Sequence, residues 1–111
     1  MNLTQLSETV YVSGQISPAD LPALNERGFS AVICNRPDGE DPGQPNAQEI
    51  QEAASAAGLL FFHVPFDPQN PSETMVADFA DALDAAPEGR VLAYCRSGNR
   101  SGRLWQASGA R

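Results

Sequence analysis

The organisation of this chain follows from one stretch, Val91-Leu92-Ala93-Tyr94-Cys95-Arg96-Ser97-Gly98-Asn99-Arg100-Ser101. An apolar run leads into a cysteine, and a short polar loop with a glycine follows and ends at an arginine. Residues 102–105 are expected to form the first turn of a helix. A loop between a strand and a helix N-terminus binds anions, because backbone N–H groups point into it and the helix dipole favours negative charge. The same field lowers the pKa of a cysteine from about 8.5 to roughly 3.5–7.5, so we expect Cys95 to be a thiolate nucleophile.

Positive charge is concentrated beside this cysteine. The seven basic residues of the chain are all arginine, and three of them, Arg96, Arg100 and Arg103, lie in this short region. The net charge of −7 argues against nucleic acid or an anionic membrane as the main partner. We therefore expect a small anion as the ligand, although the three arginines would also suit the surface of a short helix.

The composition indicates a single globular domain. The chain has 111 residues, of which 41% are hydrophobic, and this is enough for one core. No apolar run approaches the roughly 20 residues of a membrane span, and residues 1–5 lack the pattern of a signal peptide. Two cysteines suit a reducing compartment, so a cytoplasmic location is expected. No cofactor and no metal site are expected.

Strand and helix signals alternate along the chain. Apolar and β-branched runs predict strands, and capping residues, prolines and glycines delimit the helices between them. Residues 35–45 read mainly as a solvated acidic turn. The expected strands are 10–12, 29–34, 59–64 and 91–94, and the expected helices start near 18, 46, 71 and 102. This alternation predicts an α/β fold with a mostly parallel central sheet and helices on its faces.

A cysteine followed by a loop and an arginine suits nucleophilic catalysis. The thiolate attacks an electrophilic sulfur or phosphorus, while loop amides and an arginine fork bind the oxygens of that centre. Ser101 is expected to donate to the Cys95 sulfur. The residues expected to bind the oxyanion are Arg96, Ser97, Gly98, Asn99 and Arg100. The alternative is a buried cysteine that happens to precede a polar loop.

Two families resemble this sequence. The segment Cys95–Ser101 resembles the active loop of rhodanese-type sulfurtransferases, in which four residues separate cysteine and arginine. The segments Val10–Gln15, Ile33–Glu40 and Phe62–Phe66, with the pair Tyr94-Cys95, resemble the dual-specificity phosphatase fold. More closely, they resemble the phosphatase-like domain of the beta-lactamase hydrolase-like proteins, often fused to a persulfide-oxidising metallohydrolase domain.

The second resemblance implies a protein tyrosine phosphatase-like sheet of four or five strands, with helices on both faces and the cysteine loop at its C-terminal edge. It covers residues 1–111 as a single domain that lacks the C-terminal helices such domains carry, which would leave apolar surface near Leu104 and Trp105. It also suggests a metallohydrolase or persulfide dioxygenase as partner.

The two families differ in their chemistry. Phosphatases of this kind place five residues between cysteine and arginine, and usually a histidine before the cysteine, whereas this chain has four residues and Tyr94. Both departures favour a sulfurtransferase. In that reaction Cys95 takes a sulfane sulfur from thiosulfate or glutathione persulfide and passes it to a thiol such as glutathione, or to cyanide. The alternatives are a phosphatase that works through a Cys95 phosphocysteine, and a non-catalytic domain that binds an anion or a partner.

Three further residues are candidates for the site. Asp67 lies 28 residues before Cys95, where phosphatases of this kind carry the acid that protonates the leaving oxygen, but Asp67-Pro68 is also an ordinary turn. Arg36 follows the strand 29–34, where ligands collect in open α/β sheets. Cys34 is either a redox partner of Cys95 or a buried apolar cysteine.

Overall fold

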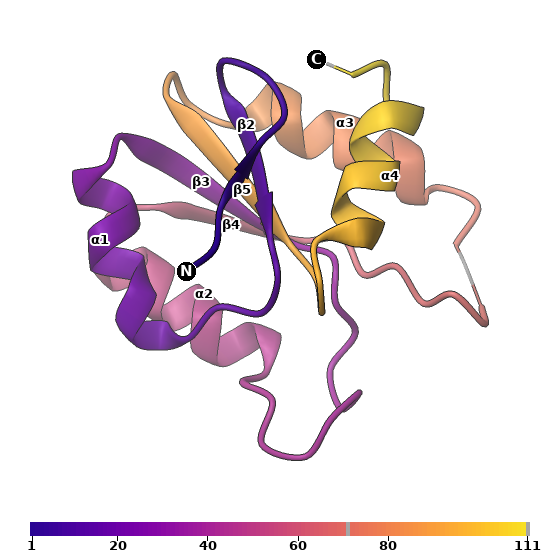
Figure 1. The fold of residues 1–111 in the computed structure, drawn as a ribbon, viewed down its shortest axis with the longest axis horizontal. Coiled ribbons are helices and arrows are strands. Elements are labelled where there is room, and N and C mark those ends of the chain that lie inside the picture. Colours follow the sequence, from indigo (N-terminus) through magenta and orange to yellow (C-terminus); the bar gives the residue numbers. More distant parts are fainter. Residues whose placement is uncertain (71, 111) are drawn as a thin grey trace.

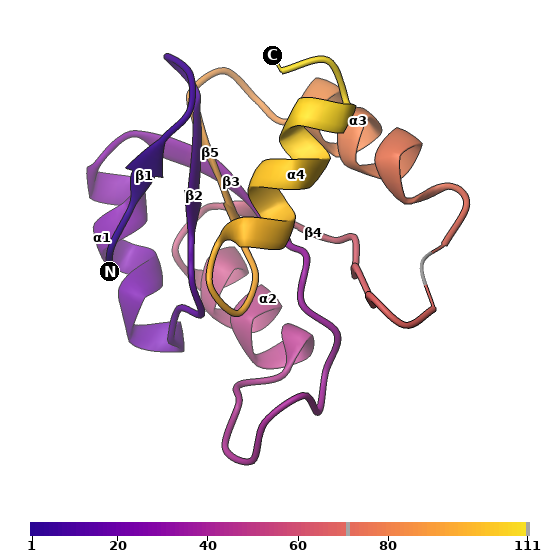
Figure 2. The ribbon, with the colours of Figure 1, turned by 45° about the vertical axis from the view of Figure 1, so that its right-hand side comes forward.

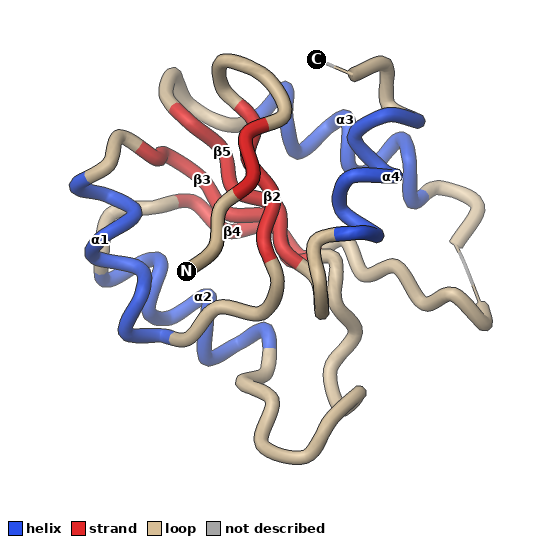
Figure 3. Tube along the Cα trace, in the orientation of Figure 1, coloured by secondary structure: helices blue, strands red, loops and turns tan. Residues whose placement is uncertain are grey.

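Parallel strands form the centre of the sheet in the computed structural model, which describes residues 1–70 and 72–110. These strands are β2 (Val10–Ser13), β3 (Phe29–Cys34), β4 (Leu60–His63) and β5 (Arg90–Tyr94). Figures 1 and 3 label these four strands. A short strand β1 (Thr4–Gln5), labelled in Figure 2, pairs antiparallel with β2 and completes the order β1-β2-β5-β3-β4. The sequence analysis did not predict β1, because two exposed residues carry no periodic pattern.

Helices cover both faces of the sheet. A 3₁₀ turn (Pro18–Asp20) leads into α1 (Leu21–Glu26), and α1 and α2 (Ala47–Ala56) lie on one face. The helices α3 (Met75–Ala85) and α4 (Asn99–Ala107) lie on the other, as Figure 2 shows. The mostly parallel α/β fold of four to five strands is therefore confirmed.

The core has two parts because the sheet is covered on both sides. Leu21, Leu24 and Ile50 pack against one face of the sheet. Phe79 and Leu104 pack against the other. Strand β3 lies between them and is buried along nearly all its length, as its continuous apolar run predicts.

Local signals set most of the helix boundaries. The capping box predicted at the start of α2 is present: the Asn46 side chain accepts from the Glu49 amide at 2.8 Å. Helix α3 begins at Met75, later than the signal at residues 70–73 suggests, and Pro71 of that signal lies outside the described residues. At the end of the chain Leu104 is buried, and Trp105 packs partly buried against the same core.

The start of α4 corrects the sequence analysis. The helix begins at Asn99 and not at residue 102, so Arg100 and Ser101 lie in its first turn. Gly98 takes a left-handed conformation and ends the loop. Because the amides of the first turn of a helix need no partner within the helix, they remain free to bind an anion. Residues 99–101 can therefore belong both to the anion-binding loop and to the helix.

The strand order places three loops at one edge. Strand β5 lies between β2 and β3, and Ser13, Tyr94 and Cys34 are paired in register at the ends of these strands. The segments that follow them, which contain Gly14, Cys95 and Arg36, therefore meet. None of the helices formed by residues 1–70 and 72–110 has the length and apolar character needed to cross a membrane.

Candidate active site

The loop after β5 closes tightly around the Cys95 sulfur. The amide of Gly98 donates to Sγ at 3.0 Å, and Gly98 has φ of 92°. A Cβ on Gly98 would lie 3.3 Å from the carbonyl carbon and oxygen of Ser13. On the other side, a Cβ on Gly14 would lie 2.9 Å from the carbonyl oxygen of Arg96. Glycine at both positions lets the loop lie directly against the end of β2.

Hydrogen bonds stabilise the thiolate of Cys95. Burial acts to raise its pKa, but backbone donors from Ser101, Ser97 and Gly98 and the Ser101 hydroxyl outweigh burial and lower the pKa. Within the described chain the buried Ser101 hydroxyl has no hydrogen bond of good geometry, yet it lies close enough to assist the thiolate. The nucleophile that the sequence predicts is therefore placed where a thiolate is favoured.

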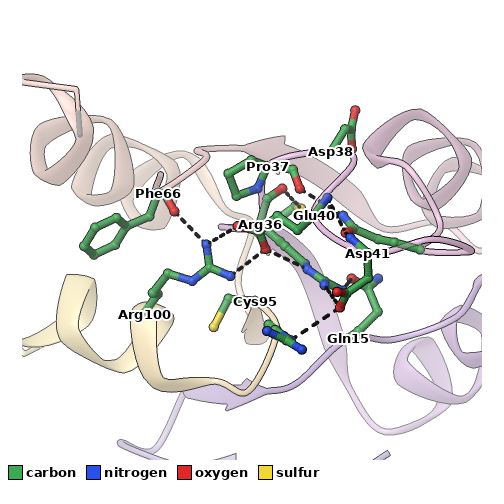
Figure 4. A network of polar contacts seen from close by, with 12 residues as sticks. Gln15, Arg36, Pro37, Asp38, Glu40, Asp41, Phe66, Cys95 and Arg100 are labelled. Carbon is green, nitrogen blue, oxygen red and sulfur yellow. Dashed lines mark hydrogen bonds and ion pairs between the residues drawn. The ribbon is translucent and has the colours of Figure 1, made fainter. Parts of the chain in front are cut away.

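Arg100 reaches across the loop to a carboxylate. Its Nη1 donates to Glu40 Oε2 and to the Phe66 carbonyl oxygen, both at 2.8 Å, and its Nη2 donates to Glu40 Oε1 at 2.7 Å (Figure 4). The hydrogen bond from Arg100 holds the pKa of Glu40 below its usual value, and Glu40 in turn raises the pKa of Arg100.

Sequence reasoning missed Glu40, which it assigned to a solvated acidic turn. Glu40 comes from the loop after β3, and the position of that loop next to β5 brings it to Arg100. The available signal was its place shortly after a strand end and next to Arg36, since such ends carry functional groups in open α/β sheets.

Arg36 lies behind this pair. Its side chain is 3% exposed, and its donors are taken by Glu40 Oε1 at 2.9 Å, Gln15 Oε1 at 3.0 Å and Asp41 Oδ2 at 2.6 Å. This geometry gives Arg36 the position of a support for the loop after β3, because each of its three guanidinium nitrogens already donates to a protein side chain. Arg96 is 69% exposed and makes one looser contact, 3.3 Å from its Nε to Asp41.

A cleft of about 500 Å³ opens beside the loop. It is lined by Glu40, Pro68, Arg96, Ser97, Asn99, Arg100 and Arg103. Asp67 is exposed and does not line this cleft; its carboxylate accepts from the Gln69 amide at 2.9 Å. No cluster of potential metal ligands occurs among residues 1–70 and 72–110.

The side chains of Cys34 and Cys95 lie in different parts of the protein. Cys34 pairs in register with Tyr94 and packs with it in the core under α1 and α2. Cys95 is the next residue, and alternation along a strand turns it away from that face. Burial raises the pKa of Cys34, and its thiol donates to the Arg36 carbonyl oxygen at 3.4 Å. A disulfide between the two free cysteines would require one of them to leave its neighbours.

A parallel sheet that ends in a cysteine loop, capped by a helix whose first turn carries the arginine, defines a cysteine-loop phosphatase-like domain. Residues 2–111 match the family model of the beta-lactamase hydrolase-like protein, phosphatase-like domain. The chain belongs to this family.

Similar proteins agree with this assignment. A beta-lactamase hydrolase-like protein of Agrobacterium fabrum is 36% identical over 101 residues, which are 91% of this chain and 23% of that protein. The chain thus spans about a quarter of this curated relative. A solved structure of a candidate phosphatase from Neisseria meningitidis is 36% identical, with a TM-score of 0.83, and the match covers 95% of this chain and 74% of that one. The P. aeruginosa protein TpbA in complex with pTyr shares the fold at 20% identity, with a TM-score of 0.66 over 93% of this chain and 59% of that one.

These findings correct the predicted chemistry. The sulfurtransferase expected from the four-residue spacer and from Tyr94 is wrong, because both the family and the similar solved structures are phosphatase-like. The structure explains why the two departures mislead. Tyr94 points into the core, where it meets Cys34 and Gln15, so it does not shape the cleft. With four residues between Cys95 and Arg100, the left-handed Gly98 and the early start of α4 still bring the backbone amides of Ser97, Gly98 and Ser101 to the Cys95 sulfur.

Proposed function

We propose that this domain hydrolyses phosphate monoesters through a phosphocysteine on Cys95. The proposal rests on the environment of Cys95 just before α4. Its sulfur accepts a hydrogen bond from the Gly98 amide at 3.0 Å, and the pKa of its thiol is lowered by the donors around it. Membership of a phosphatase-like family supports the same chemistry.

Each group of the loop has a role in this reaction. The thiolate attacks phosphorus, and the loop amides from Arg96 to Ser101 bind the phosphoryl oxygens at the positive end of the helix dipole. The planar fork of Arg100 binds two oxygens and stabilises the charge of the transition state. Ser101 stabilises the thiolate again when the phosphocysteine is hydrolysed.

The test is release of phosphate from p-nitrophenyl phosphate together with the mass of the quenched protein. The wild-type domain is expected to turn over and to carry a phosphoryl group on Cys95. Cys95→Ser is expected to lose turnover, and Arg100→Lys to lose about 10²-fold or more in kcat, because an ammonium lacks the fork. Cys34→Ala is the matched control and keeps its turnover. Turnover that survives in Cys95→Ser contradicts the proposal.

Two expectations about the surroundings belong to this proposal. The two free, buried cysteines support a reducing compartment such as the cytoplasm. The resemblance noted above supports a metallohydrolase domain as the partner, since this chain spans only part of its beta-lactamase hydrolase-like relatives. Co-purification of a metallohydrolase with this chain from its native cells would test the second expectation.

A further inference from the structure

Glu40 is the acidic side chain among the described residues that line the cleft beside the cysteine loop. Both of its carboxylate oxygens lie on the fork of Arg100, at 2.7 and 2.8 Å, and its side chain is 26% exposed. The carboxylate therefore lies where the fork would hold two oxygens of a phosphoryl group.

We propose that Glu40 is the general acid of this site, which delivers the proton to the leaving oxygen. This inference rests on the proposed phosphatase function and names a catalytic residue for it. An acid of this kind must lie within hydrogen-bond reach of the leaving group and must hold a proton when the bond breaks. The cleft position of Glu40 addresses the first requirement, and the change in its charged surroundings on substrate binding addresses the second.

The charges around Glu40 change when a substrate binds. In the free protein it faces Arg100 from α4 and Arg36 from the end of β3, and both cations favour the carboxylate. Asp41, the next residue in the same loop as Glu40, forms ion pairs with Arg36 and Arg96. A phosphate monoester dianion takes over the fork of Arg100 and places negative charge next to Glu40. Like charges favour the protonated form, so the loss of Arg100 as a partner and the charge of the dianion both raise the pKa of Glu40, while Arg36 stays beside it.

Asp67 is the other carboxylate considered for this role, and the structure favours Glu40. The Asp67 carboxylate accepts from the Gln69 amide and does not line the cleft. The residue before Asp67 contacts the site only through its backbone in this bond: the Phe66 carbonyl oxygen accepts from Arg100 at 2.8 Å. Arg100 thus joins Glu40, and not Asp67, to the phosphoryl site.

The proton and the bonds balance over two steps. In the first, the Cys95 thiolate forms the S–P bond, the P–O bond to the alcohol breaks, and the leaving oxygen takes the proton of Glu40. In the second, the Glu40 carboxylate accepts a proton from the attacking water, an O–P bond forms, and the S–P bond breaks. Phosphate leaves, and the thiolate is regenerated.

The experiment compares two esters that differ in their need for an acid. Phenyl phosphate has a poor leaving group, and p-nitrophenyl phosphate has a good one. We expect Glu40→Gln to lower kcat/KM for phenyl phosphate by about 10²-fold or more, the contribution of a general acid, and to affect p-nitrophenyl phosphate far less. Asp67→Asn is the matched control and should change both rates little and equally.

Three results separate the alternatives. A loss in Glu40→Gln that is equal for the two esters would show that Glu40 only positions Arg100, and would overturn the proposal. A selective loss in Asp67→Asn would also overturn it. If Glu40→Gln does not fold, Glu40→Asp takes its place, since the shorter carboxyl should lose more activity on phenyl phosphate than on p-nitrophenyl phosphate. A wild-type domain that hydrolyses neither ester contradicts the proposed function itself.

Discussion

Replacing Gly98 by alanine is expected to destabilise the domain and to weaken its nucleophile at the same time. Gly98 has φ of 92°, and a left-handed conformation costs an L-residue with a Cβ about 1–2 kcal/mol. The added Cβ would also lie 3.3 Å from the Ser13 carbonyl group, which belongs to the end of β2 and cannot move freely. The free energy of unfolding should therefore fall by at least about 1–2 kcal/mol.

The same change acts on Cys95. Relief of the contact moves the Gly98 amide away from the Cys95 sulfur, which it now meets at 3.0 Å. A donor that stabilises the thiolate is weakened, so the pKa of Cys95 should rise. The assay is the pH dependence of alkylation by iodoacetamide, followed at the Cys95 peptide by mass spectrometry so that Cys34 is not counted.

Gly102→Ala is the matched control in the same helix. Nothing lies within 4 Å of a Cβ at Gly102, and alanine favours a helix over glycine by about 0.5–1 kcal/mol. This variant should be slightly more stable than the wild type and should be alkylated with unchanged pH dependence. If Gly98→Ala unfolds at the same denaturant concentration as the wild type and the pKa of Cys95 is unchanged, the left-handed conformation of Gly98 does not have the role given to it here.

Three other changes have expected outcomes. Gly14→Ala should destabilise the domain by about 1–3 kcal/mol and lower turnover, measured by urea unfolding and phosphate release, because its Cβ would lie 2.9 Å from the Arg96 carbonyl oxygen. Glu40→Gln should be less stable than the wild type at neutral pH. The lowered pKa of Glu40 means that its stabilisation by Arg100 is present above the unfolded value of 4.5 and is lost as pH falls through the lower folded value. Unfolding curves of the two proteins that converge at acid pH would agree with this, and a constant gap would not. Phe79→Ala should cost about 3–5 kcal/mol, since Phe79 lies on the buried face of α3 and is fully buried, and a smaller loss in urea unfolding would show that the core closes over the cavity.

Much of the fold could be predicted from local patterns. The apolar runs at β3 and β5 and the capping box of Asn46 and Glu49 are short-range signals, because each depends on residues a few positions apart. Cys95 could also be singled out as a candidate nucleophile, since a strand, a polar loop and a helix N-terminus follow one another along the chain. Strand β1 and the start of α4 were not predicted. The first depends on pairing with β2, and the second on the left-handed turn at Gly98.

The type of reaction was predicted wrongly because it was inferred from local sequence features, whereas it depends on how the side chains are arranged in three dimensions. The spacer between Cys95 and Arg100 and the identity of Tyr94 are visible in the sequence, but their meaning depends on where the side chains point. Tyr94 faces the core, and the Gly98 amide donates to the Cys95 sulfur.

The amino-acid sequence by itself determined the alternation of strands and helices, the cysteine loop and the cluster of arginines around it. Tertiary structure alone decided which carboxylate meets Arg100. Glu40 and Arg100 lie 60 residues apart and meet because β3 and β5 are neighbours in the sheet. Strand order is set by packing over the whole core, and no local pattern encodes it. For this reason Glu40 was assigned to a solvated turn, while Asp67 was a candidate because phosphatases of this kind carry their acid at a similar place in the chain.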